Sequence, residues 1–134
     1  MKKIYNLLLI TALISLSLVL SSCGSDEPKD SSERYFVKYE LKTYSQNVFS
    51  TVDVEVTTED GIKTMNVSRD WEAIFGPFKK GTTVSFIVKM PDGIYATTKF
   101  SGKISVSKNN DPFIYKAEDN VSGKTLSLSY TIDF

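Results

Sequence analysis

The stretch Leu126-Ser127-Leu128-Ser129-Tyr130-Thr131-Ile132-Asp133-Phe134 alternates apolar and polar side chains without a break. A period of two is the spacing of a β-strand, in which successive side chains point to opposite faces of a sheet. One face of this segment is therefore expected to lie on a hydrophobic core, while the other face meets water. Antiparallel sheets have this arrangement, so the stretch predicts an antiparallel all-β fold.

Three further segments, residues 35–42, 48–56 and 83–90, show the same alternation. Their aromatic and β-branched residues are typical of strands. The apolar positions that are expected to face the core are Tyr35, Val37, Tyr39, Leu41, Val48, Val52, Val54, Val56, Val84, Phe86, Val88 and Met90.

Turn-forming residues separate the alternating segments, because glycine accepts backbone conformations that close a hairpin and proline interrupts strand pairing. Seven to nine short strands in about 100 residues predict a single antiparallel β-sandwich of the immunoglobulin-like kind, with a small β-barrel as the alternative. One helical turn is expected at Asp70–Ile74, with Asp70 as its cap. The expected turns are Glu59-Asp60-Gly61, Gly76-Pro77, Lys80-Gly81, Pro91-Asp92-Gly93, Ser101-Gly102, Asn109 to Pro112 and Asn120 to Gly123.

The composition excludes several kinds of site. The 134 residues include 16 basic and 16 acidic side chains, one Cys and no His. Without His the chain cannot form a Ser-His-Asp triad or a Cys-His pair, and one Cys cannot form an internal disulfide. A formal net charge of zero gives no general attraction to nucleic acid. No cofactor and no nucleic-acid partner is expected, and an enzyme is not predicted.

Residues 1–22 have the organisation of a secretory signal peptide. Lys2 and Lys3 precede an uncharged, mostly apolar run from Ile4 to Leu20, and small residues follow it. A positive start, an apolar run and small residues before a cleavage site define such a peptide. A transmembrane anchor is the alternative, although this run is at the short end of what spans a bilayer.

The segment Leu20-Ser21-Ser22-Cys23 resembles the lipobox of bacterial lipoproteins. The resemblance implies that Cys23 receives a diacylglycerol, that the chain is cleaved before Cys23 and that the new amine is acylated. Two or more acyl chains anchor a protein stably, whereas one chain holds it only marginally. The alternative is an ordinary signal peptide that leaves a free thiol.

The residues after Cys23 indicate the membrane to which the lipoprotein is delivered. Gly24 stands where lipoproteins retained in the inner membrane carry Asp, which implies delivery to the outer membrane. Ser25-Asp26-Glu27 resembles the export sequence of surface lipoproteins of Bacteroidota, although its acidic run stops at Pro28. This resemblance implies surface exposure, with the periplasmic face as the alternative.

The chain is therefore expected to comprise a signal peptide at 1–22, a lipidated Cys and flexible tether at 23–34, and a β-sandwich domain at 35–134. The tether sequence GSDEPKDSSER contains too little apolar surface to fold. It extends to about 36 Å at most. Cleavage removes Lys2 and Lys3, so the mature chain carries a net charge of −2.

Several features of residues 35–107 follow one another in a recognisable order. They are the opening Tyr35-Phe36-Val37-Lys38-Tyr39-Glu40, the Asp60-Gly61 hairpin, Trp71 before Phe78-Lys79-Lys80-Gly81, and Gly102-Lys103-Ile104. This order resembles small membrane-anchored immunoglobulin-like sandwiches such as the extracytoplasmic domain of mycobacterial MmpS-like proteins. The chain departs from them at Asp70, where they carry Pro, and in having no Cys in the domain. The resemblance implies an accessory or binding role and transfers no catalytic residue.

Two catalytic patterns have simpler interpretations. Ser105-Val106-Ser107-Lys108 matches the S-x-x-K pattern of Ser-Lys acylating enzymes, but a separation of three in a strand places Ser105 and Lys108 on opposite faces. Asp53 and Glu55 are neighbours on one strand face, as paired carboxylates of glycoside hydrolases can be. Strand alternation alone places both of them in solvent.

Two segments rich in oxygen ligands, Asn109-Asn110-Asp111 and Glu118-Asp119-Asn120, are compatible in composition with Ca²⁺ binding. Neither has the D-x-[DN]-x-[DN]-G spacing of a calcium loop. Turns are therefore expected at both segments, because Asn and Asp favour them.

Aromatic side chains are the candidate partner-binding residues. Trp71, Phe75 and Phe78 fall within eight residues, and Phe36 and Phe49 lie on the polar parity of their strands. Exposed aromatic residues anchor partners at interfaces, whereas for Trp71 the alternative is the centre of the core.

These observations predict a lipid-anchored, non-catalytic binding or assembly module of the cell envelope, with a protein or a glycan as its partner. One alternative is a structural or adhesion subunit that pairs through an edge strand, with the C-terminal strand as the donor. Another alternative is an inhibitor of a hydrolase.

Overall fold

The computed structural model describes residues 33–44, 51–90 and 99–134. These residues form eight β-strands, and no helix among them is long and apolar enough to cross a membrane. In chain order the strands are β1 (Tyr35–Thr43), β2 (Thr51–Thr58), β3 (Gly61–Ser68), β4 (Trp71–Phe78), β5 (Thr83–Lys89), β6 (Lys99–Lys108), β7 (Ile114–Ser122) and β8 (Thr125–Thr131).

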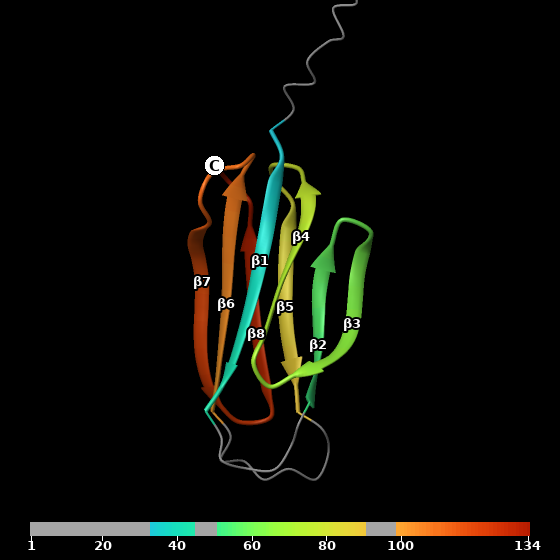
Figure 1. Cartoon of the computed structure of the whole chain (residues 1–134), viewed down its shortest axis with the longest axis vertical. Coiled ribbons are helices and arrows are strands. Elements are labelled where there is room, and N and C mark those ends of the chain that lie inside the picture. Colours follow the sequence, from blue (N-terminus) through green and yellow to red (C-terminus); the bar gives the residue numbers. More distant parts are fainter. Residues whose placement is uncertain (1–32, 45–50, 91–98) are drawn as a thin grey trace, which may run out of the picture. The chain divides into compact units, whose positions relative to one another are not determined.

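The strands form two four-stranded antiparallel sheets that pack face to face (Figure 1). Sheet A has the order β4-β1-β6-β7, and sheet B has the order β3-β2-β5-β8. The predicted β-sandwich is confirmed, and the alternative of a small barrel is wrong because the strands form two separate sheets. The connectivity differs from the A-B-E-D and C-F-G order of immunoglobulin constant domains, because β1 lies between β4 and β6.

The core lies between the two sheets and follows the predicted alternation. The inward-facing residues of β1, β2 and β5 are fully buried, and Leu126, Leu128 and Ile132 continue the core near the C-terminus. The rings of Tyr39 and Phe86 join the two sheets, with their centroids 5.5 Å apart. Val48 lies outside the described residues. Burial of this apolar surface is the main stabilising contribution to the fold.

Several predicted turns are confirmed. Asp60-Gly61 closes the hairpin between β2 and β3, in which Thr58 pairs with Gly61. Lys80-Gly81 lies between β4 and β5, and Asn109 to Pro112 connects β6 with β7. Pro91-Asp92-Gly93 lies outside the described residues.

The predicted helical turn at Asp70–Ile74 is wrong, because β4 begins at Trp71. Trp71 packs partly against the core, whereas Ile74 is exposed on the outer face. The Asp70 carboxylate accepts a hydrogen bond from the backbone N–H of Thr43 at 3.1 Å. Asp70 therefore fixes the end of β1 rather than the start of a helix.

Three segments that were expected to form turns lie inside strands. Gly76-Pro77 belongs to β4, where pairing with β1 shifts its register. Ser101-Gly102 belongs to β6, and Glu118-Asp119-Asn120 belongs to β7, paired with β6. Pairing between strands supplies backbone hydrogen bonds at these positions, so tertiary context overrides the local preference for a turn.

A candidate binding cleft on sheet A

The outer face of sheet A carries the candidate site. The register of the sheet places Phe36 of β1 beside Ser107 of β6, and Lys38 beside Ser105. Ser105 and Ser107 are only 5% and 3% exposed, although they lie on an outer face. Serine side chains are small, so the larger side chains around Ser105 and Ser107 shield both serines from solvent. The two serines therefore form the base of a depression, and the larger side chains form its sides.

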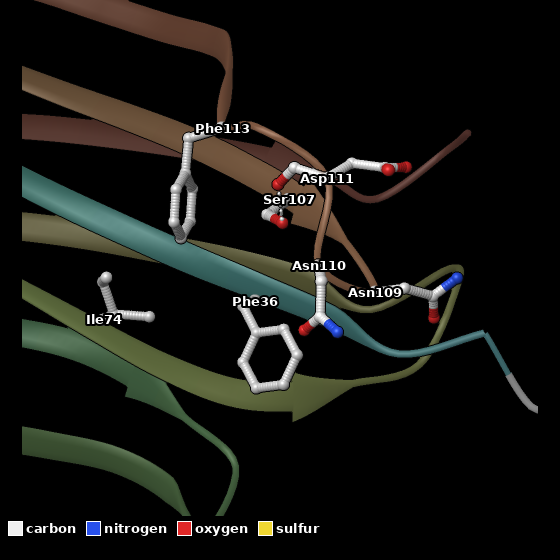
Figure 2. Close-up of a pocket in the computed structure, with 7 residues that line it drawn as sticks. All are labelled: Phe36, Ile74, Ser107, Asn109, Asn110, Asp111 and Phe113. Atoms are coloured by element: carbon white, nitrogen blue, oxygen red, sulfur yellow. Dashed lines mark hydrogen bonds between the residues drawn. The ribbon is translucent and has the colours of Figure 1, made fainter.

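Ser107 lines a cleft of about 310 Å³. Figure 2 shows the residues that line it. The rings of Phe36 and Phe113 stand on two sides of it, Ile74 lies toward one end and Asn110 toward the other. The complete lining is Phe36, Ile74, Ser107, Asn109, Asn110, Asp111 and Phe113.

Hydrogen bonds fix the loop that forms one end of the cleft. The Ser107 hydroxyl donates to the backbone carbonyl of Asp111 at 2.5 Å, and the Asp111 N–H donates to the carbonyl of Lys108 at 3.0 Å. The Asn109 N–H donates to the carbonyl of Arg34 at 2.6 Å, and the Arg34 N–H donates to Asn109 Oδ1 at 3.2 Å. Asn109 has a φ of 55°, which Asn tolerates better than most residues. The loop therefore closes against the residue that precedes β1.

The Phe36 wall depends on a glycine in β4. A Cβ built on Gly76 would lie 3.1 Å from Phe36 Cδ1 and 2.7 Å from the carbonyl oxygen of Tyr35. Gly76 also has a φ of 137°, which residues with a side chain rarely adopt. A residue without a side chain at position 76 therefore lets the Phe36 ring lie against β4.

The Phe113 wall is held by a lysine of the same face. Lys38 Nζ lies 5.7 Å from the centroid of the Phe113 ring, a cation–π distance. Lys38 also forms an ion pair with Glu40 at 3.2 Å. These two interactions restrict both the lysine and the ring.

A cluster of charges lies beside the cleft at the start of β1. Lys108 forms an ion pair with Glu33, and the Tyr35 hydroxyl donates to Glu33 at 2.6 Å. The hydrogen bond from Lys108 is the main reason that the pKa of Glu33 is lowered, and the same bond raises the pKa of Lys108. Residues 33 and 34 are therefore attached to the cleft loop by both charge and backbone contacts.

Two polar side chains of the cleft have no hydrogen-bond or ion-pair partner among the described residues. They are the Asn110 amide and the Asp111 carboxylate. Figure 2 shows Asn110 directed toward Phe36, whereas the Asp111 carboxylate points away from both rings toward the rim. An amide both donates and accepts hydrogen bonds, and a carboxylate only accepts them. The cleft thus combines apolar walls with polar groups that can bind a ligand.

The structure separates the five aromatic residues that the sequence analysis nominated. Phe36 lines the cleft. Trp71 and Phe75 are half-buried and pack against the core, and Phe78 is 6% exposed. Trp71 and Phe75 share the inward parity of β4, and the register shift between Phe75 and Phe78 turns Phe78 inward as well. Phe49 lies outside the described residues, as does Cys23.

Sequence reasoning missed Phe113, Ile74 and Asn110 as cleft residues. Phe113 follows the turn before β7, and Ile74 fell in the segment that was expected to be helical. The alternation of β1 did indicate that Phe36 points outward. Strand register, which places the other residues beside it, is a property of the assembled sheet.

The S-x-x-K pattern does not form a catalytic pair. Ser105 lies on the outer face of sheet A, where it pairs with Lys38 and Tyr115. Lys108 lies on the opposite parity beside Tyr35. The predicted placement on opposite faces is confirmed.

The neighbouring carboxylates of β2 lie on the outer face of sheet B. Asp53 accepts a hydrogen bond from Asn66 Nδ2 at 2.7 Å, and Glu55 forms an ion pair with Lys89 at 3.5 Å. Across residues 33–44, 51–90 and 99–134, no group of three or more His, Cys, Asp or Glu residues gathers as metal ligands would.

A second hollow of about 220 Å³ lies at the other end of sheet A. Its lining residues are Tyr44, Lys99, Phe100, Asn120, Val121 and Ser122. Two of them, Tyr44 and Lys99, adjoin segments outside the described residues, so the cleft beside Phe36 is the better-defined site.

A comparison of the chain with models of known protein families and with curated proteins finds no significant match. The functional proposal therefore rests on the residues of this chain and on their arrangement.

Proposed function

We propose that the chain is a lipid-anchored, non-catalytic binding module of the cell envelope, and that the cleft between Phe36 and Phe113 is its binding site. The observation that supports this proposal is the arrangement around Ser107. Two aromatic rings and Ile74 stand above a small, buried side chain on a sheet face that would ordinarily be polar. Aromatic groups displayed outside a core are typical anchors for partners.

The proposed anchor brings the cleft close to a membrane. Lipidation of Cys23 would tether the domain through residues 24–32, because Glu33 and Arg34 are attached to the domain, and nine residues reach about 30 Å when fully extended. Arg34 is hydrogen-bonded to Asn109 of the cleft loop, so the cleft lies at the tethered end of the domain. The partner is therefore a component of the envelope, a protein or a glycan. The proposed location is the outer membrane, with the domain exposed at the cell surface.

The anchor and the binding site have separate tests. Metabolic labelling with an alkyne fatty acid should label the wild-type chain and fail to label Cys23→Ser. Unaltered labelling of Cys23→Ser would contradict the proposed anchor.

The binding site is tested by photocrosslinking in intact cells that make the full chain. A photoreactive phenylalanine analogue at position 113 should give a discrete adduct with an envelope component. The control position is Ile62, which is 71% exposed and belongs to sheet B. Equal, diffuse crosslinking from positions 113 and 62 would contradict a binding role for the cleft.

The alternatives have less support in the structure. Pairing through the C-terminal strand would use the outer edge of β8, which is the end strand of sheet B and pairs only with β5 among the described strands, but β7 of sheet A lies close to that strand. A hydrolase inhibitor needs a projecting loop, yet Gly76-Pro77 lies within β4 and Asn109 is tied to Arg34. The cleft therefore remains the favoured site of interaction.

A further inference from the structure

We infer that the cleft binds a neutral pyranose unit of an envelope polysaccharide, with the sugar ring packed against Phe113 and Phe36 and hydrogen-bonded to Asn110. This inference rests on the proposed function, because it names the ligand class of the same site. Four properties of the cleft support it: its size, its aromatic walls, its polar groups and its charge.

The size and walls suit a sugar ring. A volume of about 310 Å³ is at the lower end for small-ligand sites. A pyranose ring is compact, and one of its faces exposes C–H groups. The face of an aromatic ring carries negative charge density, which attracts the positive edge of such C–H groups. Phe36 and Phe113 therefore offer two surfaces on which a sugar ring can stack.

The polar groups favour a sugar over an apolar side chain or an acyl chain. The Asn110 amide can donate to one hydroxyl and accept from another. Ser107 Oγ donates its hydrogen to the Asp111 carbonyl, so the oxygen keeps its capacity to accept. An apolar occupant that covers these groups would displace their water and leave them without partners, which costs free energy. Sugar hydroxyls satisfy them.

The charges favour a neutral sugar. Lys38 is paired with Glu40, and Lys108 is paired with Glu33. The carboxylate of Asp111 has no such partner among the described residues and stands at the rim. An acidic sugar would meet this negative charge, and both Lys38 and Lys108 are already paired with carboxylates. The cleft therefore selects against anionic saccharides.

A second exposed aromatic ring points to a polymer. Tyr115 lies two residues after Phe113, beside Ser105 on the outer face of sheet A, and is 54% exposed. Lys103 Nζ lies 5.8 Å from the centroid of its ring, which restricts the ring as Lys38 restricts Phe113. A saccharide chain that occupies the cleft can continue along β7 onto Tyr115.

The test is calorimetric titration of the full chain, purified in a detergent that has no sugar headgroup. The probes are neutral hexasaccharides of glucose, mannose, xylose and N-acetylglucosamine, together with an oligogalacturonate as the acidic probe. At least one neutral probe should bind with a Kd of roughly 1 mM or lower. The oligogalacturonate should bind at least several-fold more weakly.

Variants locate the binding on the cleft. Phe113→Ala should weaken binding of the neutral probe by about tenfold or more, and Asn110→Ala by several-fold, with unchanged thermal unfolding for Asn110→Ala. Asp111→Asn should improve binding of the oligogalacturonate. The matched control is Tyr44→Ala, which removes an aromatic ring that is 66% exposed at the other end of the domain.

Specific outcomes overturn the inference. The inference is contradicted if no neutral probe binds at a probe concentration 10-fold above the expected Kd. It is also contradicted if the wild-type chain and Asn110→Ala bind the probe equally. If the analogue at position 113 still crosslinks to an envelope protein in cells, the proposed function stands while the saccharide inference fails. If both experiments are negative, both proposals fail.

Discussion

Gly102 of β6 faces Leu126 of β8 across the interior of the sandwich, and a Cβ built on Gly102 would lie 2.6 Å from Leu126 Cδ2. Leu126 is fully buried, so its side chain has little room to move away. The absence of a side chain at residue 102 allows the two sheets to approach each other at this point.

Gly102→Ala should therefore lower the free energy of unfolding by about 1–3 kcal/mol, because it overpacks the core. This loss exceeds the gain of about 0.4–1 kcal/mol that a Gly→Ala change brings by restricting the unfolded chain. Leu126→Ala alone should cost about 2–5 kcal/mol. The double variant should be more stable than the sum of the two losses predicts, because Leu126→Ala makes room for the added methyl group and that methyl group fills part of the cavity.

Urea unfolding of the four proteins measures this coupling. If the losses from Gly102→Ala and Leu126→Ala simply add, the two residues do not compete for the same space, and the proposed close approach is wrong.

A second prediction concerns alkaline pH. Tyr39 is fully buried, and its hydroxyl donates to the carbonyl of Thr57 at 2.8 Å. Burial is the main cause that raises the pKa of Tyr39 well above its ordinary value of 10.0. Below pH 10 the tyrosine is neutral in both the folded and the unfolded chain. Above pH 10 only the unfolded chain ionises, so stability falls by up to about 1.4 kcal/mol per pH unit.

Tyr39→Phe should be about 0.5–1.5 kcal/mol less stable than the wild type at pH 7, because it lacks the hydrogen bond to Thr57. It also lacks the ionisable group, so this deficit should shrink as the pH rises above 10. Other tyrosines titrate in both proteins and cancel from the comparison. Thermal unfolding at pH 7 and pH 10.5 provides the measurement, and a deficit that stays constant would contradict a neutral, buried Tyr39.

The sequence predicted the core of this domain better than its edges. Period-two alternation identified the inward residues of β1, such as Val37 and Tyr39, because each side of a strand has a uniform environment. Local sequence preferences predicted a helical turn that begins at Asp70 and a turn at Gly76-Pro77, and both predictions were wrong. At these positions pairing between strands fixes the backbone, and the partner strand is distant in the sequence.

The cleft was only partly visible in the sequence. Phe36 was identified because its parity in β1 is polar, so an aromatic residue there is unexpected. Its partner Phe113 is 77 positions away in the sequence. Strand β6, which carries Ser107, pairs with β1 on one side and with β7 on the other, so Ser107 lies between Phe36 and the start of β7. Alternation alone does not specify that register, because it leaves open which strands are neighbours.

A third prediction separates the aromatic residues of the core from those of the cleft. The Trp71 ring lies 6.1 Å from the ring of Phe86 and packs against the core. Trp71→Ala should therefore cost about 2–4 kcal/mol in unfolding free energy, yet the folded protein should keep its crosslink from position 113. Phe36→Ala should show the opposite pattern, with a smaller loss of stability and loss of the crosslink. Loss of the crosslink in correctly folded Trp71→Ala would place Trp71 in the binding site.

The last prediction concerns the attachment of the cleft loop to the start of the domain. The pKa of Glu33 is lowered, chiefly by the hydrogen bond from Lys108, and the ionised carboxylate attaches Lys108, the residue before Asn109, to the start of the domain. A lowered pKa means that this stabilisation is present above the ordinary value of 4.5 and is lost as the pH falls through the folded value. Glu33→Gln removes the charge at every pH.

Amide hydrogen exchange at Asn109 and Asp111 should therefore become several-fold faster in Glu33→Gln at pH 7, because a loosened loop opens more often. The wild type should approach the variant at pH values below 4.5, after correction for the intrinsic pH dependence of exchange. The control is Glu72→Gln, which removes an exposed acidic group from the same sheet. Equal exchange in the wild type and Glu33→Gln at pH 7 would show that the backbone contacts between Arg34 and Asn109 suffice to hold the loop.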